Sequence, residues 1–393
     1  MRSNTLKKLT VFNYRDDDDD DDVQQQRLNL NVDDLELENF EVLDLQDISL
    51  ENDQLYNLAK FKKLHTLDVS RNDVDLTHIH IVKSLTKLNM AECGLQNIDQ
   101  ISSLVNLEEL DISYNNCIKD ISPLYQVRSL IKLFINNCGL KNIDQITQLI
   151  NLEVLYISNN QQQSIDSISL LVNLKELDIS YNDNIDIAPL KNLVGLTILN
   201  ISYCGLTQLS SSKPLINLQN LNICSYDYVN ITELQYLKNL THLNLQYCNL
   251  VSVYVLKPLV NLEVLDISFN NIVYLDANIN EMKNLKELYL LRNSISDFSS
   301  LEKHQNFNNI DEIGHRYFNI SYQNKYPSEK ELRQANKFRK IESPNIQLKE
   351  IQTQHKALKT ALDNFKREIN MVLNNARQSQ IQVHRERGFA SSS

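Results

Sequence analysis

The chain is poor in residues on which several other fold classes depend. Its 393 residues include no tryptophan, six glycines and six prolines. Glycine-rich cofactor loops need several closely spaced glycines, and extensive low-complexity disorder usually brings much more proline and glycine than this. The composition therefore argues against a glycine-rich cofactor fold and against a chain that is disordered throughout.

Long apolar runs and paired cysteines are missing as well. No run of 18 apolar residues occurs, residues 1–15 contain no continuous apolar stretch, and the six cysteines form no C-x-x-C pair. Membrane-spanning helices and signal peptides need such runs, and metal or redox sites often use such pairs. We expect no membrane insertion, reduced thiols, and a cytoplasmic or else nuclear location.

Motifs of catalysis are also lacking. The sequence has no P-loop, no G-x-S-x-G and no H-E-x-x-H, and His78 and His80 form its only close histidine pair. Two histidines alone rarely make a metal site, so both are expected on the surface. We expect a protein that is not an enzyme and that holds no metal or cofactor.

Charge is unevenly spread along the chain. Residues 323–393 contain 14 Lys or Arg and 7 Asp or Glu, whereas the whole chain has a formal net charge of −11. The part before residue 323 is therefore strongly acidic. An acidic body repels phosphates, so we expect no nucleic-acid binding.

What is present in abundance is a repeat. The pattern L-x-x-L-x-L-x-x-N/C-x-L recurs in twelve units, whose first positions are separated by 21 to 24 residues and mostly by 22. Those first positions are Phe40, Leu64, Leu85, Leu107, Leu130, Leu152, Leu174, Leu196, Leu218, Leu240, Leu262 and Leu285. Such regular spacing predicts a stack of similar structural units.

Each position in a unit, numbered from its first residue, has a physical interpretation. Positions 4 and 6 point to the core from a short strand, and positions 3, 5, 7 and 8 point to the opposite face. Position 9 is Asn or Cys, small enough to be buried and able to bond the backbone of a turn. Position 10 is Gly, Asn or Asp in nine units, so we expect positive φ there. Asn often precedes a unit and is expected to bond loop backbone.

The pattern resembles the 22-residue class of leucine-rich repeats, which includes the regulatory subunit of protein phosphatase 1 and the bacterial internalins. The resemblance covers about residues 40–300. It implies an α/β solenoid, shaped as a horseshoe with a parallel concave sheet and loops or 3₁₀ turns on the convex side. Partners of this class are proteins, and the phosphatase subunit binds its enzyme through acidic and aromatic concave residues.

The domain prediction has four parts. Residues 1–27, with the acidic run Asp16–Asp22, are expected to be disordered; 28–300 form the solenoid, 301–327 a cap, and 328–387 a helical tail. A capping box at Ser328-x-x-Glu331 and a heptad pattern from Leu348 support helices in the tail. Two interpretations stay open, a coiled coil that makes a homodimer or an amphipathic helix packed on the last repeats.

The concave face is the predicted partner site. Aromatic residues recur there among Asp and Asn, which is typical of protein-binding surfaces, although tyrosine also favours strands for its own sake. The carboxylates favour a partner with basic patches. The candidate residues are Asp111, Tyr114, Phe134, Tyr156, Asp178, Tyr181, Tyr203, Tyr247, Asp266, Phe269 and Tyr289.

The main functional hypothesis is therefore an adaptor that holds a partner protein on this face. Alternatives are a regulatory subunit of a protein phosphatase and a structural or cytoskeletal protein that dimerises through its tail. A surface adhesin similar to the internalins is less favoured, because no export signal is visible.

Overall fold

The computed structural model describes residues 7–10, 37–50, 52–162, 164–209, 212, 214–225, 227–275, 277–295, 301 and 312–314. The chain divides into two compact units, Met1–Asn319 and Ile320–Ser393, and all described residues lie in the first. The tail predicted at 328–387 and the run Asp16–Asp22 lie outside the described residues. Tail dimerisation thus stays a prediction.

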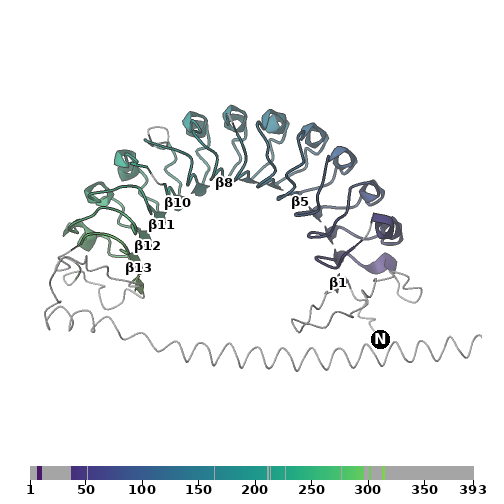
Figure 1. The fold of residues 1–393 in the computed structure, drawn as a ribbon, viewed down its shortest axis with the longest axis horizontal. Coiled ribbons are helices and arrows are strands. Elements are labelled where there is room, and N and C mark those ends of the chain that lie inside the picture. The colour runs from purple at the N-terminus through teal and green to yellow at the C-terminus, as the bar shows by residue number, and fades with distance from the viewer. Residues whose placement is uncertain are drawn as a thin grey trace, which may run out of the picture. The chain divides into compact units, whose positions relative to one another are not determined.

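The first unit is built on one parallel sheet of fourteen strands, in which every strand pairs with its neighbours in chain order. Figure 1 shows the strands along the inner side of an arc. The strands are β1 (Lys8–Thr10), β2 (Val42–Asp44), β3 (Thr66–Asp68), β4 (Lys87–Asn89), β5 (Glu109–Asp111), β6 (Lys132–Phe134), β7 (Val154–Tyr156), β8 (Glu176–Asp178), β9 (Ile198–Asn200), β10 (Asn220–Asn222), β11 (His242–Asn244), β12 (Val264–Asp266), β13 (Glu287–Tyr289) and β14 (Glu312–Gly314).

The outer side of the arc carries 3₁₀ helices, one in each described interval from β2 to β13 except that between β9 and β10. They are η2 (Asn52–Lys60), η3 (Ile79–Ile81), η4 (Asp99–Ser103), η5 (Ser122–Gln126), η6 (Asp144–Gln148), η7 (Asp166–Leu170), η8 (Ala188–Asn192), η9 (Thr232–Tyr236), η10 (Tyr254–Leu256) and η11 (Ala277–Glu281), and η1 (Leu37–Asn39) precedes β2. A 3₁₀ helix is wider than a strand, so inner strands and outer helices together bend the stack.

Register follows the sequence repeat. The central residue of each three-residue strand pairs with the central residue of the next, as in Leu155 with Leu177 and Leu177 with Leu199. These leucines are buried in one continuous core that runs the length of the described repeats. The predicted solenoid and its unit boundaries are therefore confirmed.

The first strand corrects one expectation. Lys8–Thr10 pairs in parallel with β2, and Leu9 packs against the core, although residues 1–27 were expected to be disordered. That prediction is wrong for these three residues. The polar–apolar–polar triplet of Lys8, Leu9 and Thr10 matches the strand pattern of the repeats and covers the free edge of β2.

At the opposite end of the sheet, β14 pairs with β13. This strand lies inside the segment 301–327 that was predicted to form a cap. The sheet thus extends by one strand beyond the last sequence repeat.

Buried asparagines join neighbouring units at position 9, as expected. The Nδ2 group of Asn115 donates to the carbonyl oxygens of Met90, Ile112 and Ser113 at 2.9, 2.8 and 3.2 Å. Its Oδ1 accepts the backbone N–H groups of Cys93 and Leu95 at 3.1 and 2.9 Å. One side chain therefore satisfies five backbone groups, which matters because a buried unpaired polar group is costly.

Cysteine replaces asparagine at position 9 in four units. The Sγ of Cys138 donates to the carbonyl of Ile112 at 3.2 Å, and that of Cys204 to the carbonyl of Ile179 at 3.2 Å. Burial raises the pKa of Cys93 and Cys138 to about 11 and that of Cys204 and Cys248 to about 12. These thiols are structural groups held in their neutral form.

Candidate concave binding site

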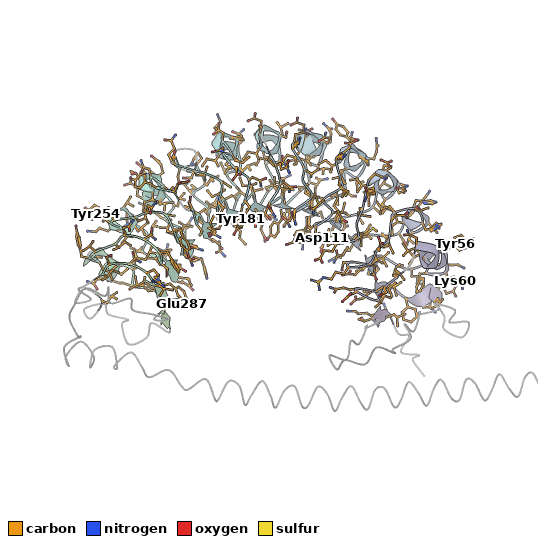
Figure 2. All side chains as sticks on the ribbon, in the orientation of Figure 1. Tyr56, Lys60, Asp111, Tyr181, Tyr254 and Glu287 are labelled. Carbon is orange, nitrogen blue, oxygen red and sulfur yellow. The ribbon has the colours of Figure 1, made fainter. Side chains whose placement is uncertain are left out.

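The predicted site residues lie on the inner face of the sheet. In each strand the central leucine is buried and its two neighbours are half-buried and face outward, as in Glu176 and Asp178 beside Leu177. Figure 2 shows Asp111, Tyr181 and Glu287 on the inner side of the arc, and Tyr56 and Tyr254 on its outer side. The structure thus places the position 5 and position 8 residues on one surface.

Six of the eight predicted aromatic residues form ring pairs between adjacent repeats. Phe134 and Tyr156 meet edge to face, with centroids 5.1 Å apart. Tyr181 stacks on Tyr203 at 4.5 Å and 26°. The second stack joins Tyr247 and Phe269 at 4.3 Å and 18°. These pairs hold the rings in fixed orientations and so prepare a rigid surface for contact.

The other two aromatic residues behave differently. Tyr289 donates its hydroxyl to Glu287 at 2.8 Å, within its own strand. Tyr114 has no ring partner among the described residues, and 53% of its surface is exposed. The aromatic site is therefore strongest from β8 to β12.

The two stacks lie in consecutive repeats with one gap between them. The unit of β10 has Ser225 at position 8, between Tyr203 on one side and Tyr247 on the other. The exposed ring of Tyr181 (54%) marks one end of this row. A side chain of a partner can therefore enter at Ser225 with aromatic rings on both sides.

Backbone geometry at position 8 was missed by the sequence analysis. Eleven of the twelve position 8 residues have φ between 49° and 61°, and all are non-glycine. They are Asp47, Arg71, Glu92, Tyr114, Asn137, Asn159, Tyr181, Tyr203, Tyr247, Phe269 and Arg292. This left-handed conformation is unfavourable for most residues and least so for Gly, Asn and Asp.

Position 10 was expected to take positive φ and does so in only part of the repeats, at Gly94, Gly139, Gly205 and Asn249. The signal for position 8 was hidden because its residues are chemically diverse. Five aromatic residues occupy a position where the backbone favours Asn, and Tyr114 and Tyr181 leave about half of their surface exposed. Neither backbone preference nor core packing explains them there.

The predicted acidic residues have a second, structural role. Asp111, Asp178 and Asp266 each accept the backbone N–H of the residue two positions on, at 2.9 Å in every case. Asp178 also accepts from Asn200 Nδ2 at 2.9 Å, and Asp266 from Gln246 Nε2. These side chains therefore support the turn after each strand as well as giving the face its charge.

Burial changes the acidity of two predicted residues. Burial raises the pKa of Asp111, and the nearby carboxylates of Asp68 and Glu109 add to this, while hydrogen bonds from Ser113 oppose it. Burial together with a hydrogen bond to Glu176 at 3.1 Å raises the pKa of Tyr156.

The concave face is acidic. Positions 3, 5, 7 and 8 of the twelve repeats hold ten carboxylates and four Lys or Arg residues, all within the described part of the chain. Three of those cations already face acids, since Lys87 and Lys132 lie 3.3 and 3.6 Å from Glu109 and Arg71 lies 3.5 Å from Glu92. The uncompensated charge of the face is therefore negative, which favours a basic partner.

Other site chemistries find no support in the described residues. No group of three or more His, Cys, Asp or Glu side chains in that part of the chain could hold a metal ion. None of its helices is sufficiently long and apolar to span a bilayer.

Comparison with known proteins agrees with this geometry. A family model described as "Leucine Rich repeats (2 copies)" matches residues 83–126 and 260–303. The chain is a leucine-rich-repeat protein. A mouse protein, leucine-rich repeat-containing protein 56, is 40% identical to it over 96 residues, which is 23% of this chain and 16% of the mouse protein.

Two solved structures from Listeria monocytogenes share the fold of this leucine-rich-repeat protein. The internalin InlF superposes with a TM-score of 0.62 at 21% identity and covers 71% of this chain and 86% of its own. The functional domain of InlJ has a TM-score of 0.53 at 23% identity and covers 66% of this chain and 55% of its own. At such low identity the likeness concerns the solenoid alone.

Proposed function

We propose that this leucine-rich-repeat protein is a non-enzymatic adaptor that binds a basic segment of a partner protein on its concave face. The observation on which this rests is the row of aromatic residues at position 8, from Tyr181 to Phe269. These rings occupy a backbone conformation that disfavours them, and they stack in pairs on an exposed surface.

The chemistry of the row suits arginine in particular. A guanidinium group binds well over the face of an aromatic ring, and it pairs with carboxylates through a planar set of donors. The gap at Ser225 offers ring faces on both sides, and Asp178 and Asp266 lie in the same sheet one and two strands away from β10 and its neighbours. An arginine side chain that enters there meets both kinds of partner group.

The six cysteines are free thiols. This supports a reducing compartment, the cytoplasm or the nucleus, as the site of action in the proposal. Fractionation of cells that produce the full chain tests this part independently.

The experiment compares two double variants of the full-length protein. Tyr181→Asn with Tyr203→Asn removes one stack while it keeps a residue that tolerates positive φ. The matched control, Tyr56→Asn with Tyr254→Asn, removes two tyrosines on the outer side, which are 65% and 64% exposed. Quantitative affinity purification with mass spectrometry measures which partners each form retains.

We expect the inner variant to lose its partners by at least tenfold in affinity, roughly 1.4 kcal/mol, and the outer variant to keep them. Retention on the unaltered protein should also fall as salt rises from about 0.1 to about 0.5 M, because the attraction is partly electrostatic. Equal retention by the two variants would show that the concave row is not the binding site.

A further inference from the structure

A second surface, separate from the concave face, lies on the flank of the repeats. Two residues before each unit's first position, the chain returns from the outer 3₁₀ helix to the next strand, as Val172 does between η7 and β8. We call these positions the flank row. From the second repeat on they are Lys62, Lys83, Val105, Arg128, Ile150, Val172, Val194, Ile216, Lys238, Val260 and Lys283.

The flank row contains only two kinds of side chain. Six positions are Val or Ile, with exposed fractions between 45% and 57%, and the other five are Lys or Arg. No acidic residue occurs among the eleven, although the repeats as a whole are strongly acidic. Four apolar residues stand in consecutive repeats, Ile150 to Ile216, and basic residues occupy the row on both sides of them, at Arg128 and Lys238.

Exposed Val and Ile in single positions are common on protein surfaces. Here they lie in register on adjacent repeats, which brings them into one continuous strip about 15 Å long at the strand spacing of roughly 4.8 Å. Contiguous exposed apolar surface of this kind marks interaction sites. The strip is therefore a candidate docking surface rather than scattered apolar exposure.

The backbone beneath the strip is already satisfied. Asn173 Nδ2 donates to the carbonyl oxygen of Ile150 at 2.9 Å, Asn217 to that of Val194 at 2.9 Å, and Asn239 to that of Ile216 at 2.9 Å. These are the asparagines that the sequence analysis expected to bond loop backbone. Because these carbonyls are occupied, an extended peptide would find few backbone partners here, whereas a helix satisfies its own backbone.

Charge identifies the chemistry of the occupant. No carboxylate among the described residues lies within salt-bridge distance of Arg128 or Lys238, and both side chains are exposed. At the start of the repeats the matching pair is made within the chain, where Lys62 lies 3.5 Å from Glu38, the flank position of the first repeat. An acid therefore pairs with a flank cation when one is supplied.

A second copy of the chain is a poor occupant. The row from Lys83 to Lys283 is symmetric in character about the midpoint between Val172 and Val194. An antiparallel copy would consequently set Arg128 against Lys238 and Lys83 against Lys283. Like charges would then oppose each other at both ends of the apolar contact.

From these observations we propose that the flank row binds an amphipathic helix of a partner protein, with an aliphatic stripe and acidic residues at both ends. Helix turns rise 5.4 Å, close to the spacing of the repeats, so successive turns can pack between successive Val and Ile side chains. Arg128 and Lys238 are five repeats apart, about 24 Å, which corresponds to about 16 helical residues.

The test uses two synthetic helical peptides of about 20 residues and the full-length protein. Both peptides have the same leucine stripe; one has glutamates at its two ends and the other has lysines there. Fluorescence anisotropy measures binding to the unaltered protein, to Val172→Ser with Val194→Ser, to Arg128→Glu with Lys238→Glu, and to the control Val251→Ser with Val273→Ser. The control residues are exposed valines outside the row.

We expect the glutamate-ended peptide to bind the unaltered protein at least tenfold more tightly than the lysine-ended peptide. The serine variant should lose at least tenfold, the control less than twofold, and the charge-reversed variant should prefer the lysine-ended peptide. The Tyr181→Asn, Tyr203→Asn variant should bind like the unaltered protein, which separates this proposal from that for the concave face.

Several results would overturn the proposal. These are equal affinity for the two peptides, an equal loss in the control, and no inversion on charge reversal. Sedimentation that shows a dimer dissociated by Val172→Ser with Val194→Ser would assign the row to a second copy. Binding to phosphatidylserine vesicles that the charge reversal abolishes, without peptide binding, would assign it to a lipid surface.

Discussion

At the scale of single residues, position 5 of the repeats combines structure and charge. Asp178 uses both carboxylate oxygens, since Oδ1 accepts from Ser180 and Oδ2 accepts from Asn200 in the next strand. Asp111 accepts only from Ser113 among the bonds found, and it lies beside Phe134 of β6. Identical residues at equivalent positions therefore face different environments.

This difference predicts opposite effects of the same substitution. The raised pKa of Asp111 means that the folded state binds the proton more tightly than the unfolded state, so its contribution to stability is full below the ordinary value of 3.8 and is lost as pH rises through the raised value. Asp111→Asn should thus increase the free energy of unfolding at pH 7, with the gain fading below about pH 4.

The matched variant Asp178→Asn should instead lower the free energy of unfolding by about 1 kcal/mol, because an amide group would face the donor of Asn200. Urea denaturation of both variants between pH 3 and pH 8 measures these changes. A loss of stability in Asp111→Asn at pH 7 would contradict the proposed environment of Asp111.

At the scale of elements, each turn from strand to outer helix depends on two positions. Position 8 reverses the chain with positive φ, and position 9 fills the turn with an amide or thiol. Position 9 could be predicted because burial permits only a small hydrogen-bonding residue. Position 8 could not, because its side chains face solvent and vary while only the backbone conformation recurs.

Removal of one position 9 amide should destabilise the whole stack. Asn182 Nδ2 donates to the carbonyls of Ile157, Ile179 and Ser180, and its Oδ1 accepts from the preceding unit. Asn182→Ala leaves these buried groups unpaired and should lower the free energy of unfolding by about 3 kcal/mol. Asn192→Ala, at the exposed end of η8, is the control and should change it by less than about 0.5 kcal/mol in the same guanidinium titration.

At the scale of the whole first unit, the repeats form a linear stack in which each unit contacts its neighbours. Consecutive strands pair at equivalent residues from β2 to β13, so adjacent units present equivalent surfaces to one another. Stability in such an array is approximately a sum over units and interfaces. Loss of one complete unit should therefore leave the remaining surfaces complementary.

Deletion of residues 152–173 removes one 22-residue unit, from Leu152 to Asn173, and joins Asn151 to Leu174. We expect a folded protein that unfolds cooperatively, at a lower midpoint and with an m-value smaller by about one twelfth, since m follows the surface exposed on unfolding. Deletion of residues 152–162 alone shifts the register by half a unit and should yield no cooperative transition in circular dichroism. Similar behaviour of the two deletions would contradict the stacked architecture.

Most of the scaffold could be predicted from the sequence. The leucine spacing predicted the parallel sheet and its register, and the small polar residue at position 9 predicted the bonds between units. The added strand Lys8–Thr10 could not be predicted, because three residues 32 positions away from β2 carry too short a pattern to be recognised. The candidate aromatic residues could be named, but their pairing could not.

The periodic sequence by itself determined which residues are buried, because a side chain's position within a 22-residue unit sets whether it faces core or solvent. Only the tertiary structure decided which exposed residues meet. Tyr181 and Tyr203 stack because two units bring them together, and Val172 and Val194 form one strip for the same reason. Burial repeats along the chain, whereas a surface forms between units and exists only once they are stacked.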